Sequence, residues 1–187
     1  MGAAMAERAL LIEAGLLLGL VWRDHRVSIA RLATVGVVVY LGAAALGHEA
    51  ALRRWEAGLS TEGLRPRIVA AIPVLGSPAL WKGLAETDAS LYEGRLTLLP
   101  GIPTEPVRYA KPNGNPFIAR AEGLSEVGLY RAFARFLWVR YAQEGIHHIV
   151  EFTDLRYGSR MLTHGMVLRV VLDGSGGVRD VHFNHRF

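Results

Sequence analysis

The sequence predicts a membrane helical hairpin followed by a small α+β domain, with a mostly antiparallel sheet of about five or six strands and one main helix. Three observations support this fold class. The 187-residue chain has a positive mean hydropathy of +0.22 and only 20% charged residues, whereas about a quarter is usual in soluble domains. Its apolar runs are concentrated before Pro66. The rest alternates short strand-like runs with glycine and proline, which is typical of a compact α+β domain.

The first apolar segment, residues 8–22, predicts a transmembrane helix, although Glu13 interrupts it. A cleaved signal peptide is the alternative. The segment lacks the basic start and the small-residue cleavage site that signal peptides have. The short link at residues 23–28 would make this helix antiparallel to the next one.

The second apolar segment, residues 29–52, predicts the clearer transmembrane helix. No charged residue occurs from Leu32 to Gly47, and with its flanks the run reaches the ~20 residues that cross a bilayer core. Arg31 and Arg53 are placed as interfacial anchors. The alternative, a buried helix of a soluble core, is disfavoured because so short a chain has little core in which to bury it. Residues 1–66 are thus expected to contain both helices and a linker.

Residues 67–187 are expected to form the α+β domain. Strands are predicted at residues 67–74, 81–87, 91–99, 146–153, 165–173 and 178–184. Apolar residues at helical spacing predict the main helix at residues 124–138, with Ser125 as its N-cap. Residues 174–177, Gly-Ser-Gly-Gly, predict a hairpin turn. If Asp173 pairs with Val178, one face buries Leu168, Val170, Leu172, Val181 and Phe183.

The distribution of basic residues predicts the location of the chain. The positive-inside bias places both termini, and with them the domain, on the cytoplasmic side of the membrane. The lipid bilayer is therefore an expected partner. Basic residues are scattered among acidic ones, so no nucleic-acid partner is expected.

The residue types restrict the chemistry of the chain. There is no cysteine, which excludes thiolate nucleophiles and thiolate metal sites. The adjacent histidines His147 and His148 would point to opposite faces of a strand, and no HExxH motif occurs. No metal ligand and no cofactor site is assigned within this chain.

Three residues are the candidate site residues. Trp81 opens a strand after a proline-rich turn, and Asp154 and Arg156 end another strand. An Asp–Arg pair in that position either fixes a loop or binds an anion. The segment Trp81-Lys82-Gly83 and the turn-rich loop 111–116 are further candidate sites. For these two segments and for the Asp154–Arg156 pair, a structural role is favoured over a catalytic one.

The order of several short motifs resembles a known family. Tyr40-Leu41-Gly42 is followed by His48, then Val69–Pro78, Trp81, Tyr109-Ala110-Lys111-Pro112, Ala134–Trp138 and Phe152–Gly158. From about Arg23 onward, this order resembles the C-terminal half of the bacterial membrane-bound metal-dependent hydrolases, also described as LexA-binding, inner-membrane-associated hydrolases. The resemblance implies a divalent metal, a hydrolytic reaction and a location in the bacterial inner membrane.

The chain departs from that family in its proposed metal site. The resemblance implies metal-binding Asp and His motifs in an N-terminal membrane half, and neither motif occurs here; Asp24-His25-Arg26 lies in a charged loop and is not assigned the role. The chain is therefore expected to be a fragment, or a short form that pairs with a membrane-protein subunit.

Two functions follow as hypotheses. One is a membrane-anchored member of the hydrolase family, inactive alone. The alternative is a non-catalytic, membrane-tethered α+β module that binds a protein or lipid. A soluble enzyme with a buried N-terminal hairpin is a third hypothesis, which the positive mean hydropathy of the chain disfavours.

Overall fold

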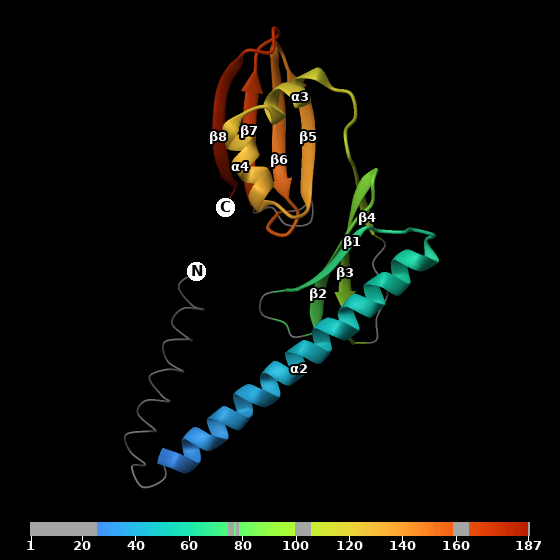
Figure 1. The fold of residues 1–187 in the computed structure, drawn as a ribbon, viewed down its shortest axis with the longest axis vertical. Coiled ribbons are helices and arrows are strands. Elements are labelled where there is room, and N and C mark those ends of the chain that lie inside the picture. Colours follow the sequence, from blue (N-terminus) through green and yellow to red (C-terminus); the bar gives the residue numbers. More distant parts are fainter. Residues whose placement is uncertain (1–25, 75–76, 78, 100–105, 159–164, 187) are drawn as a thin grey trace. The chain divides into compact units, whose positions relative to one another are not determined.

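The computed structural model describes residues 26–74, 77, 79–99, 106–158 and 165–186 (Figure 1). The first predicted transmembrane helix, residues 8–22, lies outside the described residues. The chain divides into two compact units, residues 1–46 and residues 47–187. Helix α2 contributes to both units, and the predicted boundary between a membrane part, residues 1–66, and an α+β domain, residues 67–187, stays a prediction.

Helix α2, Arg26–Thr61, contains the second predicted transmembrane segment and is longer than expected. It is long and apolar enough to cross a membrane, and none of its most apolar stretch is buried against the protein. Large apolar side chains such as Leu32, Val38 and Leu46 are 62–75% exposed. Water is a poor solvent for such a surface, and lipid is a good one.

The C-terminal part of α2 extends beyond the predicted end at Leu52 because it packs on a sheet. Ala51, Trp55 and Leu59 are buried there. The helix ends in a Schellman motif: Gly63 has φ +71°, its N–H donates to the Ser60 carbonyl, and the N–H of Leu64 donates to the Leu59 carbonyl. A glycine is required at this left-handed position because other residues are strained there.

That sheet, called sheet A, is a four-stranded antiparallel meander in the order β1-β2-β3-β4. Its strands are β1 (Ile68–Pro73), β2 (Leu80–Glu86), β3 (Ser90–Thr97) and β4 (Val107–Ala110). One face holds Trp81, Ala85 and Tyr92 against α2. The opposite face holds Leu84, Leu91 and Tyr109, which pack with Phe136 and Leu155.

A second four-stranded antiparallel sheet, sheet B, follows in the order β5-β6-β7-β8. It comprises β5 (Leu137–Glu144), β6 (His147–Asp154), β7 (Gly165–Leu172) and β8 (Val178–Arg186), and it is preceded by α3 (Pro116–Glu122) and α4 (Ser125–Phe133). The two helices lie across one face of the sheet (Figure 1). Their core contains Ile118, Val127, Tyr130, Val150, Phe152 and Leu168.

The α+β class is confirmed, but the prediction of one sheet with five or six strands and one main helix is wrong. The described chain has two sheets of four strands, and the predicted helix 124–138 ends at Phe133. The apolar spacing of residues 134–138 is compatible with a helix and with a strand. The burial of Phe136 favours the extended backbone that the structure has there. Ser125 is not the N-cap; Leu124 holds that position without a side-chain bond.

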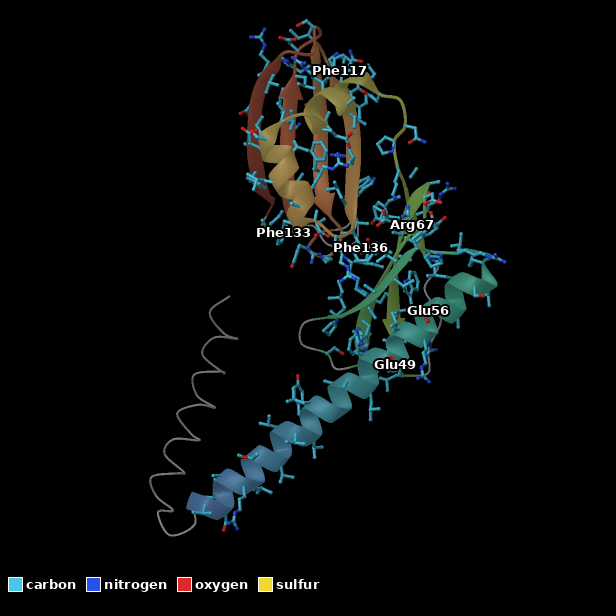
Figure 2. The ribbon with its side chains drawn as sticks, viewed as in Figure 1. Glu49, Glu56, Arg67, Phe117, Phe133 and Phe136 are labelled. Atoms are coloured by element: carbon cyan, nitrogen blue, oxygen red, sulfur yellow. The ribbon has the colours of Figure 1, made fainter. Side chains whose placement is uncertain are left out.

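Helix α3 and strand β4 lie where the sequence predicted only turns. The Asn115 side chain caps α3 by accepting from the N–H groups of Phe117 and Ile118, and Pro116 occupies the first turn. This is a recognisable start signal in the loop 111–116. Figure 2 labels Phe117 on this helix.

The terminal hairpin is confirmed with a small shift in register. Leu172, rather than Asp173, is opposite Val178, and an irregularity at Val171/Leu172 accommodates the difference. Leu168, Val170 and Leu172 are buried as predicted. Phe183, on the same predicted face, remains 50% exposed.

The Asp173 carboxylate organises this turn and also pairs with Arg179, whose Nη2 lies 3.0 Å from its Oδ2. Its Oδ1 accepts from Ser175 Oγ at 2.6 Å, from Gly177 N at 2.8 Å and from Ser175 N at 3.0 Å. The Ser175 hydroxyl and then the Gly177 N–H lower the pKa of Asp173 from 3.8 to about 2.

We expect the Asp173 carboxyl to titrate near 2 and the Ser175→Ala variant to titrate closer to 3.8. Because the folded pKa lies below the unfolded one, the ionised carboxylate stabilises the hairpin above about pH 4, and this is lost as the pH falls towards 2. Carbon-detected NMR of the side-chain carboxyl measures both values. A midpoint near 3.8 in the unaltered protein would contradict this account of the turn.

Candidate functional site

Trp81 lies in β2 and is only 5% exposed. It packs with α2 residues in the core of sheet A, and its ring centroid is 5.7 Å from that of His48. The indole N–H has no hydrogen-bond partner among the described residues. These contacts give Trp81 a packing role, and its candidate catalytic role stays a prediction.

The next residue, Lys82, points to the opposite face of sheet A and enters a buried polar cluster. Its ammonium lies 3.0 Å from the Glu93 carboxylate and donates to the Leu155 carbonyl. The Tyr109 hydroxyl donates to the other Glu93 oxygen at 2.5 Å. The Lys82 and Glu93 side chains are 10% and 3% exposed, so this charge pair is almost removed from water.

Sequence reasoning singled out Lys82 only as a neighbour of Trp81 and missed Glu93 and Tyr109. A signal was present, because Lys82 alternates with Leu84 in one predicted strand and Glu93 alternates with Leu91 in the next, so each charge shares a strand face with an apolar residue. The pairing itself depends on the register of β2 with β3, in which Lys82 faces Arg95 and Leu84 faces Glu93. The sequence of one strand alone therefore cannot predict this diagonal contact between Lys82 and Glu93.

Asp154 and Arg156 form a tight ion pair at the turn after β6. Asp154 Oδ2 accepts from Arg156 Nε at 2.8 Å and from Arg135 N at 3.2 Å, and Oδ1 accepts from Arg156 N at 3.0 Å. Asp154 is 1% exposed. Its hydrogen bond raises the pKa of Arg156.

The surroundings of this pair favour the loop-fixing interpretation over anion binding. The Arg156 guanidinium also donates to the Phe133 carbonyl, and it lies 5.2 Å and 5.0 Å from the ring centroids of Phe133 and Tyr157. Both Asp154 oxygens are therefore engaged in holding the turn. Tyr130 contributes as well, since its hydroxyl accepts from Asp154 N and donates to the Met166 carbonyl. Burial raises the pKa of this tyrosine.

The structure brings only part of the candidate set together. Lys82 contacts the carbonyl of Leu155, which lies between Asp154 and Arg156. Trp81, by strand alternation, faces α2 on the other side of sheet A. The three predicted residues therefore do not converge on one reacting point.

A cleft with a volume of about 560 Å³ lies elsewhere in the described chain. Its walls come from the end of β2, the loop before α3, the two short helices and the start of β5. Its lining residues are Glu86, Lys111–Pro116, Ile118, Ala119, Glu122, Arg131, Leu137 and Val139. Of these lining residues, the sequence pattern singles out only the loop 111–116.

The charged side chains that line this cleft form two ion pairs with one another. Lys111 Nζ lies 2.5 Å from Glu86 Oε1 and 2.9 Å from the Thr87 carbonyl. Arg131 lies 3.3 Å from Glu122. The apolar part of the lining includes Ile118, Leu137 and Val139. A cleft that combines apolar walls with polar groups able to orient a ligand is typical of a binding site.

The described histidines do not cluster with other metal ligands. His148 is buried, stacks on Phe117 with a centroid distance of 3.5 Å and bonds the Tyr141 hydroxyl through Nδ1 at 2.6 Å. His147 is exposed, as expected from alternation. Within the described ranges, no group of three or more His, Asp or Glu side chains could hold a metal ion.

Comparison with known protein families, curated proteins and solved structures gives no match for this chain. The similarity to membrane-bound metal-dependent hydrolases therefore stays a prediction from the order of motifs.

Proposed function

We propose that the chain is a membrane-anchored binding protein, in which α2 provides the anchor and the two-sheet unit, residues 47–187, provides the recognition surface. The exposed apolar surface of α2 is the observation that carries this proposal. About 20 residues of helix are needed to cross a bilayer core, and α2 has 36. Its remaining turns pack on sheet A.

The site geometry supports binding as the role of the two-sheet unit. The charged candidates Lys82, Asp154 and Arg156 are each held by protein partners that fix strands or turns. The cleft beside α3 and β5 combines apolar walls with charged rims. That combination suits recognition of a partner.

The hydrolase family supplies the competing proposal. In that case a second membrane subunit would provide the metal ligands, and this chain would support it. The order of motifs from Tyr40 to Gly158 is what favours this function.

Extraction of membranes from cells that express the full chain tests the anchor. We expect the protein to stay in the membrane pellet in carbonate at high pH and in high salt, and to be released by detergent, because its apolar helix is solvated by lipid. A matched variant carrying Leu32→Glu, Val38→Glu and Leu46→Glu should lose retention, since charges in a bilayer core are costly. Release of the unaltered protein by carbonate alone would contradict the proposal.

Metal analysis of the chain purified in detergent from its native membranes, together with any subunit that co-purifies with it, separates the two functions. The binding proposal expects no stoichiometric divalent metal and no turnover in a panel of phosphodiester and ester substrates. Bound metal together with turnover would favour the hydrolase instead.

A further inference from the structure

Strand β5 is an edge strand, and its free side borders the cleft. It pairs only with β6 in the described sheet, through the register Leu137↔Asp154 to Glu144↔His147. The Phe136 carbonyl accepts from Leu155 N on the β6 side. The N–H and C=O of one residue in a strand point the same way, and this direction alternates.

The alternation fixes which backbone groups of β5 have no strand partner among the residues that the structure describes. Trp138, Arg140 and the other even-numbered residues direct their backbone groups to β6. The odd-numbered residues, beginning with Leu137 and Val139, direct theirs to the free edge. Leu137 and Val139 also line the cleft. The outward backbone groups of these two residues therefore border the cleft, about 7 Å apart along the strand.

The other edge strands of the described sheets carry a proline, a short length or an irregularity, and β5 carries none of these; its charged side chains, Arg140 and Glu144, lie in ion pairs with Glu151 and Arg169. β1 contains Pro73, β4 has only four residues, and β8 lies against a register irregularity. β5 has eight residues in regular register. Edges are usually protected by proline, shortness, irregularity or charge, because an open edge is a template for another strand.

We propose that the cleft beside β5 binds an extended peptide segment of a partner protein, which joins sheet B as an added strand along Leu137 and Val139. Unpaired backbone donors and acceptors at strand spacing are matched by a peptide backbone. Apolar side chains at alternate positions of the peptide would contact Ile118, Leu137 and Val139. Charged residues flanking them would meet the Lys111–Glu86 and Arg131–Glu122 pairs at the rims.

This inference rests on the proposed binding function and names its partner class. The probe is a phage-displayed library of random octapeptides, selected against the full chain in lipid nanodiscs. The enriched sequence is then made as a blocked synthetic peptide. We expect alternating apolar residues, and at least tenfold protection of the Leu137 and Val139 amides from hydrogen exchange when the peptide is bound.

Two N-methylated versions of the peptide test backbone pairing without altering the protein. Each version is methylated at one of the two alternating sets of amides. Only the set that faces β5 donates to the added ladder, so we expect one version to lose affinity at least tenfold and the other to change less. Equal affinity of both versions and the unmodified peptide would overturn the proposal.

Variants of the protein provide a second test. Val139→Pro removes an N–H that lies outside the β5–β6 ladder and should weaken peptide binding at least tenfold. Leu129→Ser, at an exposed α4 side chain outside the cleft, should leave the affinity unchanged. Circular dichroism checks that both variants fold.

Three further outcomes would overturn strand addition at β5. They are protection mapped to another edge, self-association of the chain through β5, and no enrichment of any peptide. Binding at another edge would leave the proposed binding function in place. Absence of enrichment together with bound metal and turnover would remove the binding function as well.

Discussion

Replacing Gly83 or Gly94 with alanine is expected to destabilise the two-sheet unit by about 1–3 kcal/mol, the usual cost of overpacking a core. The two glycines face each other across β2 and β3. The indole of Trp55 from α2 lies directly over both. A Cβ at Gly83 would come within 2.6 Å of this ring, and a Cβ at Gly94 within 2.5 Å.

Urea unfolding of the full chain in detergent, followed by tryptophan fluorescence, measures this effect. Gly58→Ala is the matched control, because Gly58 is a glycine of α2 with open space around it. That change should stabilise the helix by about 0.5–1 kcal/mol. The cost of Gly83→Ala should shrink when Trp55 is replaced by leucine, since both changes act on one contact. An equal cost in both backgrounds would show that the indole is not the obstacle.

Replacing Lys82 with methionine is expected to destabilise the protein by about 3–5 kcal/mol, because it leaves the buried Glu93 carboxylate without its counter-charge. The Leu155 carbonyl would also lose its donor. The double variant Lys82→Met/Glu93→Gln should recover part of this loss, because no isolated charge is then buried. Urea unfolding measures both variants.

The sequence contains one other lysine, Lys111, which is the matched control. It also pairs with a glutamate, but the Lys111 and Glu86 side chains are 29% and 24% exposed. Water can therefore solvate Glu86 after Lys111→Met, and we expect a clearly smaller loss of stability. Similar losses at both lysines would contradict the importance of burial for the Lys82 pair.

Local patterns predicted those parts of the fold that depend on neighbouring residues. The apolar run of α2 and the alternation in β1, β2, β3 and β6 were recognisable, as was the Gly-rich turn of the β7–β8 hairpin. The failure at residues 134–138 has a definite cause. Ala134, Leu137 and Trp138 continue the helical spacing of α4, yet Phe136 is buried between the sheets by contacts with Leu84 and Leu91. Long-range packing outweighed local periodicity there.

Candidate site residues were predicted less well than the strands that carry them. Asp154 and Arg156 do form the expected pair, because two residues separated by one position can meet across a single turn. The Lys82–Glu93–Tyr109 cluster and the cleft could not be predicted, since each depends on how separate strands align. The open edge of β5 was hidden for the same reason, as its residues were partly assigned to a helix.

By itself, the sequence determined that this chain has an apolar helix of membrane-spanning length and a strand-rich unit without thiol chemistry. Hydropathy, alternation and composition depend on residues close together in the chain. Only the tertiary structure decided that the strands form two sheets, that Gly83 and Gly94 receive Trp55, and that Leu137 and Val139 line an open edge. These outcomes depend on which distant surfaces bury each other, and many pairings satisfy the same local pattern.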